Sequence, residues 1–327
     1  MRLGAILPHL LVFGGIRRYI ELGNAFIGRG HEFIIFTPDG IGSDWLRFDG
    51  EIRPFSELPN ARLDIAMCGS PELTGELDRA DARERIFYLQ IESVRGEEMI
   101  VRSGAYRIMV NSGGLASRIR RRYGIEPIDG IGGVNPDLFY PIERERGGGF
   151  NILCYGRLSR PRKGTRFVVR AASWMHGRGF DVSLQLFDTV NPGEEDPRVG
   201  FDPGMPYTYY LDLPQERMAA MYSAADVFVS AEHRAGWSNT AAEASACGLP
   251  VICTPSGTSD FAVDRVSALV VPRRSARGIR KALLELYRER RLAARLGKEA
   301  RRRMLSFTWD EVCGRMERQF RMLARNR

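Results

Sequence analysis

Residues 236–250 read GWSNTAAEASACGLP and lie between two short apolar runs. Val227–Ser230 (VFVS) precedes them, and Pro250–Cys253 (PVIC) follows. Glycine, serine, asparagine and threonine lead into a run of small residues. This pattern predicts a helix over Thr240–Cys247 that ends at Gly248. A strand, a helix and a second strand in this order predict a βαβ unit on a parallel sheet.

The same alternation continues in both directions along the chain. Strands are predicted over Arg2–Leu7, Glu32–Thr37, Leu63–Met67, Ile86–Gln90, Tyr106–Val110, Phe150–Tyr155 and Ser183–Phe187. Helices are predicted after Gly14-Gly15, over Ser112–Tyr123, Thr165–Met175 and Pro214–Ser223, with one or two over Arg277–Met304 and a last one from the capping box Thr308-x-x-Glu311. The fold class is therefore α/β with parallel sheets.

A break in composition divides the chain into two similar halves. Pro136–Pro141 is followed by the alternating charges of Glu143–Arg146 and by Gly147-Gly148-Gly149, which is typical of a linker. A length of 327 residues is enough for two domains of ~150 residues each. We predict Rossmann-like domains over residues 1–145 and 149–306, a final helix over 307–327, and a ligand in the cleft between the halves.

The charge balance is basic and consists almost entirely of arginine. The net charge is +8, and Lys163, Lys281 and Lys298 are the only lysines among 48 basic residues. This surplus suits nucleic acid, an anionic membrane or a phosphorylated small molecule equally well. No run approaches the ~20 apolar residues of a membrane-spanning helix. Leu3–Phe13 is interrupted by Pro8, so we interpret it as a buried strand and not as a signal segment.

The cysteines and histidines indicate neither a disulfide framework nor a metal site. The five cysteines are odd in number and widely spaced, and none forms a CxxC pair. The four histidines lack the spacing of metal ligands. We therefore predict a protein of the reducing cytoplasm without a zinc site.

A basic loop follows the first predicted strand of the second half. Residues 156–164 read GRLSRPRKG, with four cations between two glycines. Guanidinium and ammonium groups on a loop held by glycine and proline suit a phosphate-rich ligand. The alternative is a solvated basic loop, which is what most charged runs are.

The start of the helix in residues 236–250 is a second candidate for anion binding. Its polar residues present backbone N–H groups at a helix N-terminus, where the helix dipole favours negative charge. Glu243 is expected to face hydroxyl groups, as an acidic residue does when it binds a ribose diol. The alternative is structural, because Thr240-x-x-Glu243 is itself a capping box.

Gly14-Gly15 lies between a predicted strand and a predicted helix. A glycine pair at this position lets the backbone approach a ligand closely, and it also suits a tight turn with no ligand. The GxGxxG fingerprint and the phosphate-binding loop of nucleotide hydrolases are both absent from the sequence. The sequence therefore argues against an ordinary dinucleotide oxidoreductase.

Together these segments resemble a retaining GT-B glycosyltransferase of the family-four type, the glycosyl transferases group 1. The matching segments, in order, are Gly14-Gly15 with Gly30-His31-Glu32, Gly132–Pro141, Gly156–Gly164, Tyr222–Val229 and Glu243–Val251. The resemblance implies two Rossmann-like domains facing across a cleft, with an acceptor-side domain first and a donor domain second. It also implies a C-terminal helix that crosses back to the first domain.

The resemblance assigns roles to individual residues. Arg157 and Lys163 would hold a donor diphosphate, and Glu243 would bind the ribose. The donor would also contact Gly14, Gly15, Gly236, Trp237, Ser238, Asn239, Thr240 and Ala241. The implied reaction moves a sugar from a nucleotide diphosphate sugar, carrying UDP or GDP, to an acceptor hydroxyl, with retention of configuration and without a metal or prosthetic group.

The chain departs from the family pattern around the sugar. Ala235 stands where the family usually has a second glutamate, so Glu232 or His233 is a candidate to contact the sugar or acceptor. Gln90 stands where the family often has a histidine, and Ser93 is a further candidate. The acceptor class stays open between a carbohydrate, a lipid-linked molecule and a small molecule.

The resemblance places the protein in cell-envelope or polysaccharide biosynthesis, in the cytoplasm or at the inner face of the membrane. Arg118–Arg122 and Arg301–Arg303 form basic runs that are either solvated helix faces or contacts to an anionic membrane. Tyr207, Tyr209 and Tyr210 either flank the base or lie in a strand. Two alternatives to a glycosyltransferase are a nucleotide-sugar epimerase of the same fold and an arginine-rich nucleic-acid binder. The motifs favour no nucleic-acid partner, because no nucleic-acid motif or aromatic platform appears.

Overall fold

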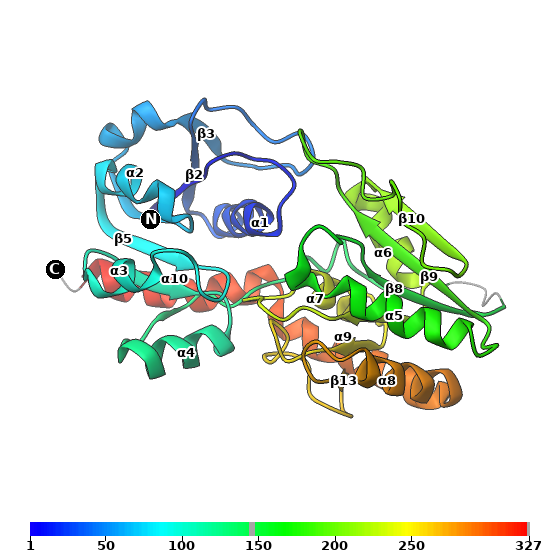
Figure 1. The fold of residues 1–327 in the computed structure, drawn as a ribbon. Coiled ribbons are helices and arrows are strands. Elements are labelled where there is room, and N and C mark those ends of the chain that lie inside the picture. Colours follow the sequence, from blue (N-terminus) through cyan, green and yellow to red (C-terminus); the bar gives the residue numbers. More distant parts are fainter. Residues whose placement is uncertain (144–147, 326–327) are drawn as a thin grey trace. The chain divides into compact units, whose positions relative to one another are not determined.

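The structure is a computed structural model that describes residues 1–143 and 148–325 (Figure 1). The chain divides into two compact units, one from Met1–Gly133 with the residues from Trp309 onward, and one from Val134–Thr308. Residues 144–147 of the predicted linker lie outside the described residues. Within the described ranges, no helix combines the length and the hydropathy that crossing a bilayer requires.

A parallel seven-stranded sheet forms the centre of the first unit, in the order β3-β2-β1-β4-β5-β6-β7. Its strands are β1 (Arg2–Ile6), β2 (Glu32–Thr37), β3 (Glu51–Pro54), β4 (Leu63–Cys68), β5 (Ala82–Leu89), β6 (Arg107–Val110) and β7 (Ile128–Asp129). Its helices are α1 (Gly14–Gly28), α2 (Thr74–Arg79), α3 (Glu97–Arg102), α4 (Gly113–Tyr123) and α10 (Trp309–Arg325), with short 3-10 helices η1 (Phe55–Asn60) and η2 (Pro71–Leu73).

The central strands of this sheet are buried on both faces, because their side chains alternate between two apolar cores. Ile65 and Met67 of β4 belong to the core that includes α1 and α10, whereas Ala66 and Cys68 belong to the core on the other face. Each fully buried aliphatic side chain contributes about 1.5–3 kcal/mol. A strand covered on both faces reads as a continuous apolar run, which is the pattern that predicted these strands.

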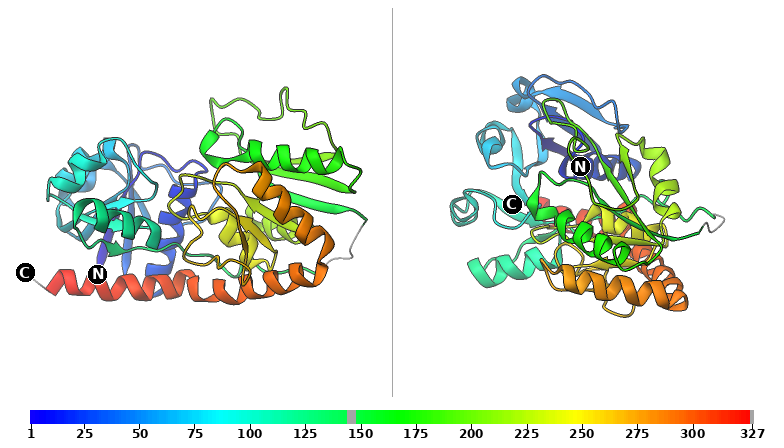
Figure 2. Two further views of the ribbon diagram at one scale, coloured as in Figure 1. Left: turned by 60° about the horizontal axis from the view of Figure 1, so that its bottom comes forward. Right: turned by 45° about the vertical axis from the view of Figure 1, so that its right-hand side comes forward.

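Helix α10 completes the first unit. Phe320 stacks on Phe26 of α1 with ring centroids 5.7 Å apart. Gln319 accepts a hydrogen bond from the amide of Asp129 at 2.9 Å and donates to its carbonyl oxygen at 3.1 Å. Figure 2 shows this helix in red beside the blue N-terminal elements that it contacts. The last helix thus packs on the first half of the chain, as the sequence predicted.

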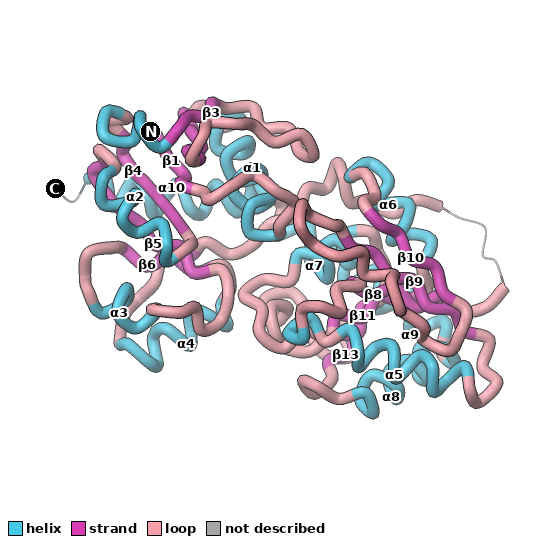
Figure 3. The backbone as a smooth tube through the Cα atoms, turned by 45° about the horizontal axis from the view of Figure 1, so that its top comes forward, coloured by secondary structure: helices cyan, strands magenta, loops and turns pink. Residues whose placement is uncertain are grey.

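The second unit has a parallel six-stranded sheet in the order β10-β9-β8-β11-β12-β13 (Figure 3). Its strands are β8 (Phe150–Tyr155), β9 (Val182–Asp188), β10 (Tyr207–Leu211), β11 (Val227–Ser230), β12 (Val251–Cys253) and β13 (Leu269–Val270). Its helices are α5 (Thr165–His176), α6 (Gln215–Ala224), α7 (Asn239–Ala246), α8 (Ala276–Arg288) and α9 (Arg290–Met304), with short 3-10 helices η3 (Pro161–Lys163) and η4 (Leu305–Phe307). The predicted α/β class with two parallel sheets is confirmed.

The structure sharpens several boundaries. The basic stretch from Arg277 is two helices, α8 and α9, which separate at Glu289. The tyrosines of residues 207–210 lie in β10, which agrees with the strand alternative. Helix α7 begins at Asn239 with Ser238 as its N-cap, so the structure does not support a capping box at Thr240.

Candidate functional site

The two strongest motifs of the second unit meet at the carboxyl edge of its sheet. Strands β8 and β11 are neighbours, and each is followed by one of the motif loops, residues 156–164 and 231–238. The amide of His233 donates to the carbonyl oxygen of Arg162 at 3.0 Å. Gly164 has φ of +73°, and a Cβ there would lie 2.9 Å from the Cβ of Ala231. The chain continues from β8 to β9 on one side and later returns from β10 to β11 on the other side. Open α/β sheets bind ligands at the carboxyl edge beside such a change of direction.

Lys163 and Glu232 form an ion pair across these two loops. The Lys163 ammonium donates to Glu232, and it lies 5.1 Å from the ring centroid of Tyr155. The Lys163 side chain is 25% exposed, whereas that of Glu232 is 6% exposed. The Thr254 hydroxyl donates to the Glu232 carbonyl oxygen and fixes the loop from the β12 side. The pair therefore covers its carboxylate and leaves part of its cation open to an anionic ligand.

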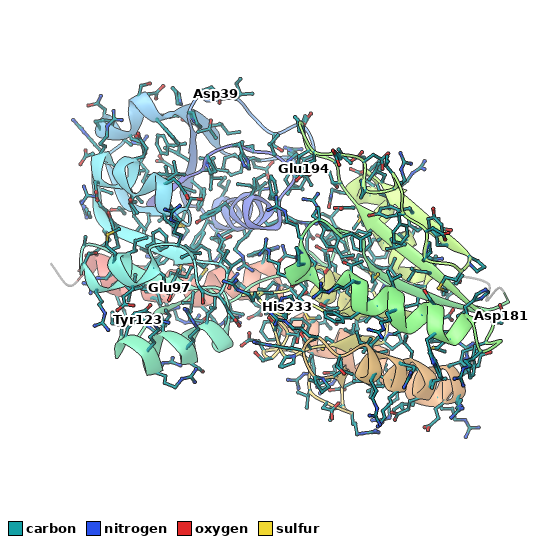
Figure 4. The ribbon with its side chains drawn as sticks, viewed as in Figure 1. Asp39, Glu97, Tyr123, Asp181, Glu194 and His233 are labelled. Atoms are coloured by element: carbon teal, nitrogen blue, oxygen red, sulfur yellow. The ribbon has the colours of Figure 1, made fainter. Side chains whose placement is uncertain are left out.

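Arg157 has a different environment, because its guanidinium is buried among acceptors. Its Nε donates to the two carboxylate oxygens of Asp188 at 2.9 and 3.1 Å, and its other nitrogens reach Glu194 and the Thr189 carbonyl oxygen. Glu194, labelled in Figure 4, lies on the loop after β9. Burial works against the charge, but Asp188 and the neighbouring anionic groups keep the Arg157 pKa above its usual value. Arg157 and Lys163, predicted together as diphosphate ligands, thus have separate acidic partners.

The N-terminus of α7 is held in place by the loop after β12. The amide of Ser238 donates to the Gly257 carbonyl oxygen at 2.8 Å, and that of Ala235 donates to the Ser256 hydroxyl at 2.9 Å. The first turn of α7 has no acidic side chain, so the positive end of the helix dipole is not offset there. The N–H groups of a first turn have no partner within the helix. This arrangement favours an anion.

The side chain of Trp237 is buried in the hydrophobic core. Its ring packs against Phe261 and Phe307, with centroids 4.9 and 5.4 Å away, and it is 6% exposed. The indole Nε1 is buried and has no hydrogen-bond partner among the described residues. Any contact between this residue and a donor would therefore come from its backbone.

Glu243 lies inside α7 and faces Tyr222 of α6. The Tyr222 hydroxyl donates to Glu243 Oε2 at 2.8 Å, and Glu243 is 5% exposed. Because the helix begins four residues earlier, at Asn239, the carboxylate is too far from the N-cap to act in a capping box. A buried carboxylate that already accepts from a neutral hydroxyl suits hydroxyl recognition.

In the first unit, the structure brings Gly15 and Gln90 together. Helix α1 begins at Gly14 without a side-chain cap, and a Cβ on Gly15 would lie 2.7 Å from Gln90 Oε1. Gln90 directly follows β5, and its Nε2 is buried with no hydrogen-bond partner among the described residues. The Tyr19 hydroxyl of α1 is also buried without such a partner. This group of polar atoms is neutral, unlike the charged pairs of the second unit.

Ser93 has a different neighbour from Gln90. Its backbone has φ of +57°, and its hydroxyl accepts a hydrogen bond from Arg118 at 3.3 Å. Arg118 also donates to the buried Glu97 at 2.6 Å, and Tyr123 donates to the same carboxylate at 2.8 Å (Figure 4). The structure therefore ties Ser93 to α3 and α4.

Most arginines of the two basic runs, Arg118–Arg122 and Arg301–Arg303, form ion pairs or hydrogen bonds within the protein. On α4, Arg118, Arg120 and Arg122 pair with Glu97, Glu126 and Glu98. On α9, Arg301 and Arg303 donate to the carbonyl oxygens of Ala246 and Phe261, and Arg302 pairs with Glu299. These contacts favour the structural alternative, since they offset most of the charge that a membrane contact would use.

Several residues of this edge escaped the sequence analysis. Asp188 was recognisable in principle, because an acid at the end of β9 lies beside the basic loop that follows its neighbour β8. Tyr222 and Tyr155 gave no signal, since each occupies an apolar position of a helix or strand. Among the described residues, no group of three or more histidine, cysteine, aspartate and glutamate side chains is arranged to hold a metal ion.

Sequence comparison assigns a family to this part of the chain. Residues 149–289 match the family described as Glycosyl transferases group 1. The matched residues make up most of the second unit. A D-inositol 3-phosphate glycosyltransferase of Thermomonospora curvata is 27% identical over 263 residues, which cover 68% of this chain and 58% of that relative. The chain thus spans less than two thirds of the length of this curated relative.

Solved structures of glycosyltransferases share the whole fold. A sucrose-phosphate synthase from Thermosynechococcus elongatus superposes with a TM-score of 0.81 at 20% identity, over 98% of each chain. The Anabaena protein HepE, solved in complex with UDP-glucose, gives a TM-score of 0.76 at 12% identity, over 98% of this chain and 100% of that one. At these identities the likeness establishes the fold, which is the GT-B fold of group 1 glycosyltransferases.

Proposed function

We propose that this protein transfers a sugar from a nucleotide diphosphate sugar to an acceptor hydroxyl, with retention of anomeric configuration. The observation that carries the proposal is the edge of the second unit. There, Lys163 with Glu232, and Glu243 with Tyr222, accompany the N-terminus of α7. The family match to residues 149–289 supports it, and so does the likeness to a protein solved with UDP-glucose.

The proposed role of this edge is to stabilise the leaving diphosphate. Breaking the bond between sugar and phosphate places negative charge on the leaving oxygen, and groups already aimed at that charge lower the barrier. Lys163 is partly open to solvent and is held by Glu232, so its position is fixed before a ligand binds. The uncapped first turn of α7 adds backbone N–H donors. Neither contribution needs a metal.

Glu243 is proposed to bind the ribose of the donor. A ribose diol offers two hydroxyl donors, which suit a carboxylate. Tyr222 holds Oε2 and thereby orients the carboxylate towards such a ligand. UDP and GDP share this ribose, so the position recognises the nucleotide without choosing the base.

Arg157 is proposed to join the diphosphate site by exchanging acidic partners. In the structure its guanidinium is satisfied by Asp188, Glu194 and a carbonyl oxygen. A phosphate offers the same bidentate geometry as a carboxylate, so part of this network can exchange for a donor phosphate. Glu194 is the partner more open to solvent, with a side chain 30% exposed against 3% for Asp188, so we expect it to release Arg157 first.

The first unit is proposed to supply the acceptor side. Gly15 and Gln90 form a compact polar position at the start of α1, and neutral amide groups suit sugar hydroxyls. Ser93 is a further candidate on the loop after β5. We propose an acceptor that is a carbohydrate, a lipid-linked sugar or a small molecule, and a protein that works in the cytoplasm or at the inner membrane face.

The test is transfer with defined donors. UDP-, GDP-, TDP- and ADP-glucose are incubated with the protein and a panel of hydroxyl acceptors, and the released nucleoside diphosphate is measured. We expect release with a UDP or GDP sugar that persists in the presence of EDTA, and an NMR spectrum in which the product keeps the donor's anomeric configuration. Inverted product, or epimerised donor without transfer, would contradict the proposal.

A further inference from the structure

His233, predicted from the sequence as a candidate to contact the sugar or acceptor, is a buried histidine at the same edge of the second unit. It is 8% exposed, and its ring Nδ1 is buried with no hydrogen-bond partner among the described residues. A buried polar nitrogen without a partner costs about 1–3 kcal/mol. Figure 4 labels His233 on the loop between β11 and α7. A bound ligand is one source of the hydrogen-bond partner that this atom lacks within the chain.

Four arginines act on this histidine through their positive charges. Arg234 is its neighbour in the chain, Arg166 lies in the first turn of α5, and Arg273 and Arg274 lie just before α8. Burial lowers the His233 pKa first, and the charges of these four arginines lower it further. The imidazole is therefore neutral near pH 7 and sits in a strongly positive environment.

Two of these arginines have exposed side chains. Among the described residues, neither Arg166 nor Arg274 forms an ion pair. The exposed Arg120 of α4, by contrast, pairs with Glu126. Positive charges that act on the same imidazole also repel one another, and a bound anion would remove that repulsion.

The backbone adds to the positive field. Helices α5 and α8 pack on each other and start at the same edge of the sheet, after β8 and β13 (Figure 1). Neither helix has an acidic residue in its first turn, and the N-cap of α5, Gly164, offers no side chain. The first turns of both helices therefore lack a negative charge, and at α8 the Ser275 hydroxyl accepts from the Gly278 amide at 3.0 Å.

We propose that His233, with Arg166, Arg234, Arg273 and Arg274, binds a phosphate group at a site separate from the donor diphosphate. The guanidinium groups supply bidentate donors to phosphate oxygens. Neutral His233 supplies one N–H, and the tautomer with hydrogen on Nδ1 gives the orphaned atom a partner. Lys163 is assigned to the donor diphosphate and is not included in this site. The separation distinguishes a second phosphorylated ligand from the donor itself.

The test follows the His233 ring by NMR while inorganic phosphate is added. Because a bound anion stabilises imidazolium, we expect phosphate to raise the pKa of His233, which the arginines now lower. The double variant Arg166→Gln with Arg274→Gln should bind phosphate at least tenfold more weakly. The control Arg121→Gln with Arg291→Gln, which removes two exposed charges elsewhere, should bind as the wild type does. An unchanged His233 pKa at saturating phosphate, or equal binding by the two double variants, would overturn the proposal.

Further experiments distinguish a soluble phosphate from a lipid headgroup as the ligand. They also test whether the site is independent of the donor diphosphate site. The same titration is made with UDP, and with phosphatidylcholine vesicles with and without phosphatidylglycerol. A response to inorganic phosphate alone supports a soluble phosphorylated ligand, and a larger response to phosphatidylglycerol vesicles supports a lipid headgroup. The Lys163→Ala variant should keep its response to inorganic phosphate, which holds even if the proposed transferase activity fails. Loss of that response would mean that Lys163 belongs to the same phosphate site as His233, which would overturn the proposal.

Discussion

The two units carry the same parallel architecture but different chemistry at the carboxyl ends of their strands. In the second unit, Lys163 with Glu232 and Arg157 with Asp188 place paired charges on the loops after β8, β9 and β11. In the first unit, the loops after β1 and β5 place Gly15 beside the neutral Gln90. The fold places candidate binding residues at the carboxyl ends of the strands in both units, whereas the chemistry of those residues determines which ligand can bind. A charged edge suits a diphosphate, and a neutral edge suits hydroxyl groups.

The largest effect is expected when the charge of the second unit is removed. Lys163→Ala should lower kcat/KM by about 10²–10³-fold, the usual cost of removing one group that stabilises charge in a transition state. Lys163→Arg should recover part of this loss, because it restores the positive charge. The measurement is the initial rate of nucleoside diphosphate release.

Lys298→Ala is the matched control, because this lysine is exposed on α9. It should have wild-type kinetics. Equal activity of Lys163→Ala and Lys298→Ala would contradict the proposed role of Lys163 in stabilising the leaving diphosphate.

The next effect concerns the carboxylate on α7. Glu243→Gln keeps an oxygen that accepts from Tyr222, so the fold should be preserved, but it replaces a charged acceptor with a neutral one. Nucleoside diphosphate binding should weaken about tenfold or more, because hydrogen bonds to charged groups contribute roughly 1.5–3 kcal/mol. Isothermal titration calorimetry measures this change.

Tyr222→Phe tests the orienting partner of Glu243. It should weaken the same binding less than Glu243→Gln does, since the carboxylate remains. A Glu243→Gln protein that binds nucleoside diphosphate as tightly as the wild type would exclude the ribose role.

A smaller effect is expected at the neutral edge. In Gly15→Ala the new Cβ would meet Gln90 Oε1 at 2.7 Å, and the flexible end of Gln90 must move away. We expect kcat/KM to fall about fivefold, or roughly 1 kcal/mol, with little change in nucleoside diphosphate binding. Adding Gln90→Ala relieves the clash, so the two substitutions should be non-additive. Additive losses would mean that Gly15 and Gln90 do not act together.

The smallest effect concerns the attachment of α10 and depends on pH. Hydrogen bonds from Arg321, Arg29 and His31 lower the Glu317 pKa to about 2, below its usual 4.5. A carboxylate with a depressed folded pKa contributes stability above pH 4.5, and this contribution is lost as the pH falls towards 2. Glu317→Gln should therefore lower Tm at pH 7 by a few degrees and by progressively less in acid. Glu299→Gln, at an exposed pair, is the control; an equal Tm loss for both at pH 7 would contradict this role.

Much of the fold could be predicted because its determinants are local. Short apolar runs rich in β-formers, such as residues 150–155, are typical of buried strands, and small residues after a polar cap are typical of a helix start. The short strands β3, β7 and β13 were missed, since two to four residues carry too little pattern. The start of α7 was misplaced by one residue, because Ser238 is selected as N-cap by its hydrogen bond to Gly257.

The candidate site was less predictable, because side-chain partners are set by tertiary structure. The sequence indicated Arg157 and Lys163 as one cationic group, yet each has its own carboxylate. It indicated Trp237 at the motif without showing that the ring packs between Phe261 and Phe307. Gly15 and Gln90 lie in separate motifs, and only the packing of α1 against the end of β5 brings them into contact.

The most direct test of the central claim is nucleoside diphosphate binding at the charged edge. Thermal unfolding is recorded for the wild type, Lys163→Ala and Lys298→Ala with UDP, GDP, TDP and ADP. A ligand that binds only the folded protein raises Tm. We predict that UDP or GDP raises Tm of the wild type and of Lys298→Ala, and that Lys163→Ala loses most of this rise. No rise with any nucleotide, or an undiminished rise in Lys163→Ala, would contradict the account.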